Sequence, residues 1–139
     1  MGIEVLNGYG ITECSPVIAV NRNNYKKDSS VGQVIKGGKV KIVDNEILFK
    51  GNSVMLGYYR DTETTDMVLK KGWFYTGDYG YLDVDNFLFI TGRKKNLIIL
   101  SSGENVSPEV IESELLHEEG VCKVIVYAKD NKIMASIYP

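Results

Sequence analysis

The chain has 139 residues, of which 44% are hydrophobic and 24% are charged, and its net charge is −2. This composition is that of one globular domain, or slightly more, with enough apolar residues for a core. The lack of a basic block argues against nucleic-acid binding, and the apolar runs are too short to cross a bilayer. No signal peptide is visible, and Cys14 and Cys122 lie too far apart for a metal motif, so we expect a cytoplasmic protein with reduced thiols.

The first part of the chain is typical of short strands and loops. Apolar residues predict strands at 3–6 and 17–20, and the glycines between them predict a loop at 7–10. The polar, turn-rich stretch 21–30 predicts an exposed loop.

Two hairpins and a short helix are expected in the middle of the chain. Alternating residues on either side of Asp44-Asn45 predict the first hairpin, over 39–49, and the second is expected over 80–91. Between them, an Asp or Thr cap predicts a helix over 61–69 that Gly72 ends.

The last part predicts a helix followed by a pair of strands. Ser107 as cap and Pro108 at the first helical position favour a helix start. Strands are expected at 121–128 and 133–138. Together these patterns predict an α+β protein, with a mostly antiparallel β-piece first and a separate α+β piece last.

The motif Gly8–Glu13 carries side chains suited to a nucleotide. Its glycines let a backbone approach a ligand closely, and Tyr9 offers a flat face to a heterocycle. Thr12 and Glu13 offer oxygens that suit a phosphate and a hard divalent cation. A tight turn with a buried tyrosine explains the same residues equally well.

Two further motifs follow. Tyr75-Thr76-Gly77-Asp78 can present a carboxylate to the two hydroxyls of a ribose, although the same pattern also forms ordinary turns. In the stretch Ile90–Pro108, the basic triplet 93–95 lies between apolar segments, and the planar fork of Arg93 can donate to sugar hydroxyls or to phosphate. A solvated surface turn is the alternative for this triplet.

In chain order the motifs read Gly-Tyr-Gly-Ile-Thr-Glu, Tyr-Thr-Gly-Asp, Gly-Arg-Lys-Lys-Asn-Leu-Ile-Ile and Gly-Glu-Asn-Val-Ser-Pro. This combination and spacing resemble the adenylate-forming (AMP-binding) superfamily of acyl-CoA synthetases, peptide-synthetase adenylation domains and luciferases. The resemblance runs from about Val5 to the end of the chain. The sequence of the stretch 92–108 looks most like the long-chain fatty acid–CoA ligase branch.

The resemblance implies roles for the first motif. Tyr9 would stack on adenine, and Gly10 beside it would belong to the same nucleotide-binding set. Thr12 would contact the α-phosphate, and Glu13 would bind Mg²⁺, which gives both residues a catalytic role.

The resemblance also implies roles for the later motifs. Asp78 would hold the ribose hydroxyls, with help from Arg93. Lys95 would sit at the hinge about which a small C-terminal lobe rotates between adenylation and thioester formation. The loop 102–104 would approach CoA or the adenylate in the second state.

The implied architecture has two parts. Residues 1–92 would form the last, distorted barrel-like β-subdomain of a large AMP-binding lobe, and 93–139 the hinge and a truncated small α+β lobe. The family's Gly-rich phosphate loop with its Lys, and its late catalytic Lys, are absent from the sequence. We therefore expect a fragment that is inactive by itself and that self-associates through exposed apolar surface.

The implied parent is an AMP-forming acid–thiol ligase that uses ATP, Mg²⁺ and CoA. It would activate a carboxylic acid as acyl-AMP and pass the acyl group to CoA. The residues of the stretch 92–108 indicate that this acid is a fatty acid. Two alternatives stay open: an amino-acid-activating adenylation domain that serves a carrier protein, and a non-catalytic nucleotide-binding or structural module.

Overall fold

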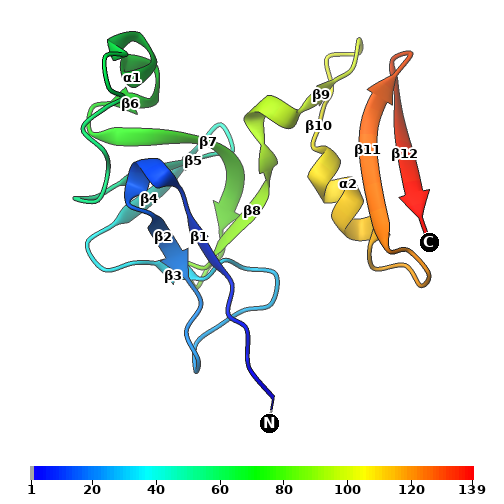
Figure 1. Ribbon diagram of the computed structural model, residues 1–139, viewed down its shortest axis with the longest axis horizontal. Helices are drawn as coiled ribbons and strands as arrows, with labels where there is room; N and C mark the ends of the chain where they lie inside the picture. The colour runs from blue at the N-terminus through cyan, green and yellow to red at the C-terminus, as the bar shows by residue number, and fades with distance from the viewer. Residues whose placement is uncertain (1) are drawn as a thin grey trace. The chain divides into compact units, whose positions relative to one another are not determined.

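The computed structural model of the chain describes residues 2–139 (Figure 1). Its sheets are built from antiparallel strand pairs, and two helices complete it, so the predicted α+β class and antiparallel character are confirmed. The chain divides into two compact units, one ending at Ile90 and the other spanning Thr91–Pro139. Within residues 2–139 no sheet closes into a barrel, which corrects the barrel-like expectation.

The first unit opens with a three-stranded sheet of β1 (Gly8–Gly10), β2 (Val17–Val20) and β3 (Gln33–Val34). The predicted strand 17–20 is confirmed as β2. The predicted strand 3–6 does not form, and the predicted loop 7–10 instead contains β1, which pairs with β2. The glycines that indicated a loop thus lie in a strand, because a cross-strand pairing decides the local structure.

A larger sheet carries the rest of the first unit. Its strands are β4 (Lys39–Val43), β5 (Glu46–Lys50), β6 (Leu69–Lys70), β7 (Trp73–Leu82) and β8 (Leu88–Arg93), in the order β4-β5-β7-β6 with β8 also on β7. Both predicted hairpins form. Asp44 and Asn45 have φ of 50° and 64°, the left-handed conformation that tight two-residue hairpins need.

The short helix α1 (Thr62–Val68) begins at a capping aspartate, as predicted. Thr64 donates its backbone N–H to the Asp61 carboxylate at 2.9 Å. The helix ends earlier than predicted, because the next two residues pair with β7 as β6. Gly72 (φ 75°) therefore turns the chain between β6 and β7 and does not stop the helix.

One hydrophobic core joins the two sheets of the first unit. Apolar side chains from β1, β2, β5, β7 and β8 meet there with the short 3-10 helix Thr12–Cys14. The buried members are Tyr9, Cys14, Ile18, Ala19, Ile47, Phe49, Phe74 and Leu88. Tyr9 is thus fixed by packing before any ligand is considered.

The second unit is a small α+β piece. After the 3-10 helix Lys94–Asn96 it contains β9 (Ile98–Ile99), β10 (Asn105–Val106), α2 (Pro108–Leu115), β11 (Lys123–Lys129) and β12 (Lys132–Tyr138). The predicted helix and strand pair are confirmed. Their core has Ile98, Val124 and Val126 at its centre, with α2 packed against β11.

Ser107 precedes α2 but does not cap it through its side chain, which corrects that expectation. Its hydroxyl donates instead to the carbonyl oxygen of Thr91, at 2.8 Å, and lies 2.8 Å from the Glu109 carboxylate. Within the described residues 2–139, no helix has the length and apolar character that crossing a bilayer requires.

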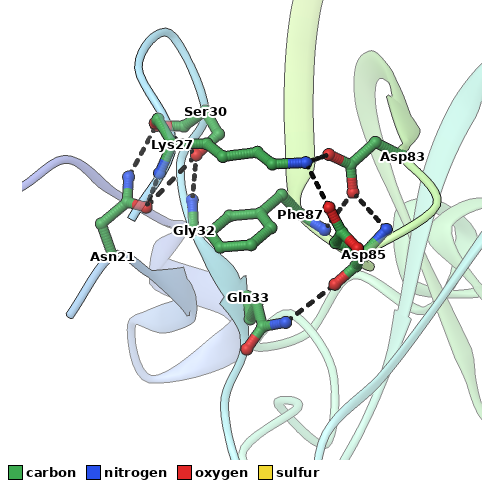
Figure 2. Close-up of polar contacts among 8 residues, drawn as sticks. All are labelled: Asn21, Lys27, Ser30, Gly32, Gln33, Asp83, Asp85 and Phe87. Atoms are coloured by element: carbon green, nitrogen blue, oxygen red, sulfur yellow. Dashed lines mark hydrogen bonds and ion pairs between the residues drawn. The ribbon is translucent and has the colours of Figure 1, made fainter. Parts of the chain in front are cut away.

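A polar network ties the loop 21–30 to the turn between β7 and β8 (Figure 2). Lys27 reaches across the ring of Phe87, 5.2 Å from its centroid, to the carboxylates of Asp83 and Asp85. At the two ends of the loop, the Asn21 amide donates to the carbonyl oxygen of Ser30 at 2.8 Å, and both residues are buried. The loop predicted to be exposed is therefore anchored at its ends and at Lys27.

We expect Asp83→Ala to lower the melting temperature more than Asp85→Ala does. The Asp83 carboxylate accepts the backbone N–H groups of Asp85 and Phe87, at 2.9 and 2.8 Å, as well as Lys27. The more exposed Asp85 side chain accepts only Lys27 among the described residues, at 2.6 Å. Thermal unfolding at neutral pH measures both variants, and equal losses would contradict the central place of Asp83.

The pH dependence has a defined sign. The hydrogen bond from Lys27 holds the pKa of Asp83 below its usual value. The stabilisation that the Asp83 carboxylate contributes is therefore present above its pKa in the unfolded state. It is lost as pH falls through its pKa in the folded state. Acidification should consequently narrow the gap in melting temperature between the wild type and Asp83→Ala.

Candidate functional site

Two irregular strands bring the first two motifs together. In β7, the residues Thr76-Gly77-Asp78 stand opposite the single residue Ile47 of β5, because Tyr75 pairs with Leu48 and Tyr79 with Glu46. In β2, the extra residue Ile18 lies between the partners of Tyr9 and Gly10. Such bulges redirect side chains and are common next to functional sites.

Tyr9 and Asp78 are in direct contact. The Tyr9 hydroxyl donates to Asp78 Oδ2 at 2.7 Å, across 69 positions of sequence, and both side chains are buried. Burial, and next the bond to Asp78, raise the pKa of the Tyr9 hydroxyl above its ordinary range. The hydroxyl is therefore protonated, and a donor, at neutral pH.

The backbone beneath Asp78 is held by a separate set of bonds. Gly77 donates its N–H to Glu46 Oε1 at 3.0 Å, and its φ of 71° is a left-handed value that favours glycine. The Asp78 N–H donates to the Thr76 hydroxyl at 3.0 Å, which in turn donates to the carbonyl oxygen of Ile47 at 2.7 Å. The bulge is thus fixed from β5.

Glu13 lies on the short 3-10 helix that follows β1. Its Oε1 accepts the Tyr58 hydroxyl at 2.7 Å, and its backbone carbonyl accepts the N–H of Met55 at 2.7 Å. The bond to Glu13, and next burial, raise the pKa of Tyr58 to about 12. Thr12, beside it, is exposed. The carboxylate of Glu13 is therefore oriented by a second tyrosine.

The donor chemistry of this site fits a nucleotide and a magnesium ion. A buried carboxylate can accept two sugar hydroxyls, and Asp78 is 4% exposed. Mg²⁺ binds through one or two carboxylates and keeps several waters. Within residues 2–139 no group of three or more His, Cys, Asp or Glu side chains is placed to hold a metal. Glu13 offers a single carboxylate, which accepts the Tyr58 hydroxyl.

The third motif lies in the second unit. Arg93 ends β8, Lys95 lies in the following 3-10 helix, and both are exposed. The Asn96 amide donates to Glu109 Oε1 at 2.6 Å, which ties this turn to the start of α2. The loop 102–104 is exposed between β9 and β10. The positive charges at 93–95 are thus presented on a turn that α2 supports.

Sequence reasoning missed the residues that orient the site. The sequence motifs do not include Tyr58 or Glu46, and they include Thr76 only as part of the stretch 75–78. The aromatic segment 55–59 was visible in the sequence, but the partner of Tyr58 lies 45 positions away. The three-dimensional structure is needed to show which carboxylate Tyr58 contacts.

Comparisons with known proteins identify relatives of this chain. The AMP-binding enzyme family matches residues 1–59. A long-chain-fatty-acid–CoA ligase of Mycobacterium bovis, FadD15, is 38% identical over 126 residues, which cover 90% of this chain and 21% of that protein. A 2-succinylbenzoate–CoA ligase of Listeria monocytogenes is 38% identical over 138 residues, which cover 97% of this chain and 29% of that protein.

A solved structure is also similar. O-succinylbenzoate coenzyme A synthetase (MenE) of Bacillus subtilis, in complex with ATP and magnesium ion, is 32% identical with a TM-score of 0.81. The match covers 94% of this chain and 30% of that one.

The chain belongs to the adenylate-forming, AMP-binding superfamily, as its motifs predicted. Its relatives include long-chain fatty acid–CoA ligases, the branch that the stretch 92–108 resembles. The chain spans 21% and 29% of the lengths of the two curated relatives above.

We expect Gly10→Ala to destabilise the first unit strongly. An added Cβ would lie 2.2 Å from the backbone oxygen of Pro16, which also accepts the N–H of Ile11 at 2.7 Å and cannot easily withdraw. The loss should reach the upper end of the roughly 1–3 kcal/mol that overpacking costs. Urea unfolding measures it.

Gly8→Ala is the matched control, since it lies in the same strand. A Cβ there would approach the backbone oxygen of Ala19 only to 3.3 Å. We expect a change within about 0.5 kcal/mol. Equal losses at the two glycines would show that the bulge beside Tyr9 does not depend on close packing.

Proposed function

We propose that this chain is part of an ATP-dependent acid–CoA ligase. The whole protein would activate a carboxylic acid as acyl-AMP with release of pyrophosphate, and then transfer the acyl group to CoA. The observation that carries this proposal is the buried contact between Tyr9 and Asp78, formed by the two motifs that bind nucleotide in the resemblance. The 38% identity to CoA ligases supports the acceptor.

Each site residue has a role in this proposal. Tyr9, beside Gly10, faces adenine, and Asp78 accepts the ribose hydroxyls with help from Arg93. Thr12 donates to an oxygen of the α-phosphate. The acid's carboxylate oxygen forms a bond to the α-phosphorus as the bond to pyrophosphate breaks, and fixed donors and positive charge stabilise that transition state.

Glu13 would hold the magnesium ion. Its carboxylate is of the hard oxygen type that Mg²⁺ prefers, and the Tyr58 hydroxyl, at 2.7 Å, fixes its direction. When bound, the ion supplies charge neutralisation at the phosphate oxygens.

The two parts of the chain would belong to two lobes. In this proposal residues 1–92 complete the large nucleotide-binding lobe, and 93–139 begin the small lobe, with Lys95 at the hinge. The loop 102–104 would approach CoA after the small lobe rotates.

We propose that the acid is a fatty acid, because the sequence of the stretch 92–108 resembles that of long-chain fatty acid–CoA ligases. An aromatic acid is the second candidate, because the 2-succinylbenzoate–CoA ligase of Listeria monocytogenes is also 38% identical to this chain. A carrier protein in place of CoA, self-association of the chain and a cytoplasmic location remain predictions.

Pyrophosphate exchange into ATP tests the function. It is measured on the product of the complete reading frame that contains this sequence, with panels of fatty, aromatic and amino acids, and thioester formation is then followed with CoA. We expect exchange with fatty acids and transfer to CoA, and background exchange by the 139-residue chain alone. Exchange with amino acids only, or with no acid, would contradict the proposal.

Asp78→Ala should weaken ATP binding in the same protein. It removes two charge-assisted hydrogen bonds to ribose, each worth roughly 1.5–3 kcal/mol. Calorimetry measures the change, and Asp66→Ala, an exposed carboxylate on α1, serves as control. Unchanged ATP affinity in folded Asp78→Ala would disprove the ribose assignment.

Lys95→Pro should separate the two half-reactions. Proline fixes φ near −65° and so hinders the backbone rotation that a hinge residue undergoes. One half-reaction should survive while the other fails, as measured by pyrophosphate exchange and by thioester formation from preformed acyl-AMP. Lys94→Ala is the control, and equal loss of both half-reactions would argue against Lys95 as the pivot.

A further inference from the structure

The Tyr9 side chain has two separable parts. Its ring belongs to the hydrophobic core of the first unit, whereas its hydroxyl leaves that core to reach Asp78 Oδ2 at 2.7 Å. Phenylalanine would supply the same ring for packing in this core. The hydroxyl must therefore be explained by what it does to Asp78.

The backbone of Asp78 does not need Tyr9. Bonds from Gly77 to Glu46 and from Thr76 to Ile47, at 3.0 and 2.7 Å, already fix the bulge against β5. Those bonds act on the backbone, whereas the carboxylate turns about its terminal torsion, which is broad for aspartate. The donor from β1 acts on that torsion.

A bond from Tyr9 is compatible with a bound ribose. A carboxylate offers about four lone-pair sites and can accept several donors at once, so the bond from Tyr9 does not exclude bonds from sugar hydroxyls. Burial keeps the Tyr9 hydroxyl protonated, since it raises the pKa of that group above its ordinary range. The hydroxyl is thus available as a donor to Asp78 at neutral pH.

We propose that the Tyr9 hydroxyl is a positioning group for ribose: it sets the rotation of the Asp78 carboxylate so that both sugar hydroxyls find an acceptor. This role rests on the proposed function, and it is additional to the contact of the Tyr9 ring with adenine. Preorganising the acceptor lowers the cost of ordering it when nucleotide binds. The hydroxyl therefore governs discrimination between ribose and deoxyribose, and the ring does not.

The test compares AMP with 2′-deoxy-AMP. Calorimetry on the complete reading-frame product gives the dissociation constant of each nucleotide for the wild type and for Tyr9→Phe. We expect the variant to bind AMP about tenfold more weakly, a change of about 1.4 kcal/mol, and to bind 2′-deoxy-AMP with a much smaller loss. The preference for ribose should consequently shrink.

Tyr79→Phe is the matched control. Tyr79 lies on β7 next to Asp78, and its hydroxyl makes no hydrogen bond among residues 2–139. This variant should keep the wild-type preference. If the Tyr9 hydroxyl were merely structural, Tyr9→Phe would lower the affinities for AMP and for 2′-deoxy-AMP by the same factor. The ratio of the two affinities would then be unchanged, and that result would overturn the proposal.

Tyr9→Phe could fail to fold because it removes a hydrogen-bond donor from the buried Asp78 carboxylate, and a double variant tests the proposal in that case. In an Asp78→Ala background no such charge remains, and adding Tyr9→Phe should change AMP affinity by less than about twofold. A further tenfold loss would show that the hydroxyl acts without Asp78 and would overturn the proposal.

The outcomes distinguish a failure of the positioning role from a failure of the proposed function. A wild type that prefers ribose, with the preference unchanged in Tyr9→Phe, overturns the positioning role and leaves the proposed function standing. A wild type that binds neither nucleotide overturns both.

Discussion

A single buried hydrogen bond, from the Tyr9 hydroxyl to the Asp78 carboxylate, is the constraint on which the candidate site depends. It connects strands that are 69 positions apart and that both depart from regular pairing at this point. A buried carboxylate is costly without partners, and the Tyr9 hydroxyl is one partner of the buried Asp78.

Tyrosine hydroxyls recur as the means of orienting acidic groups in the first unit. Tyr58 holds Glu13 at 2.7 Å in the same way that Tyr9 holds Asp78. A hydroxyl on a rigid ring can fix a carboxylate without adding charge, which leaves the negative charge available to a cation or to sugar hydroxyls. Away from the site the protein uses a cation instead, since Lys27 pairs with two aspartates at the β7–β8 turn (Figure 2).

Much of the fold could be predicted from the sequence where local chemistry decides it. The hairpin at Asp44-Asn45 and the helix cap at Asp61 follow from residue preferences that act over a few positions. The failures involve contacts that the local residue types did not indicate: β1 pairs with β2, the end of the predicted helix pairs with β7 as β6, and the Ser107 hydroxyl donates to Thr91. For the site, the motifs supplied Asp78 and Glu13, but their orienting tyrosine contacts required the fold.

The most direct measurement is an AMP titration of the isotopically labelled 139-residue chain, followed by amide NMR. The account predicts that even weak, millimolar binding shifts the amides of residues 8–13 and 76–78 together, with one affinity, because one contact joins the two segments. Shifts confined to one segment, or to residues remote from both, would contradict a nucleotide site built on Tyr9 and Asp78.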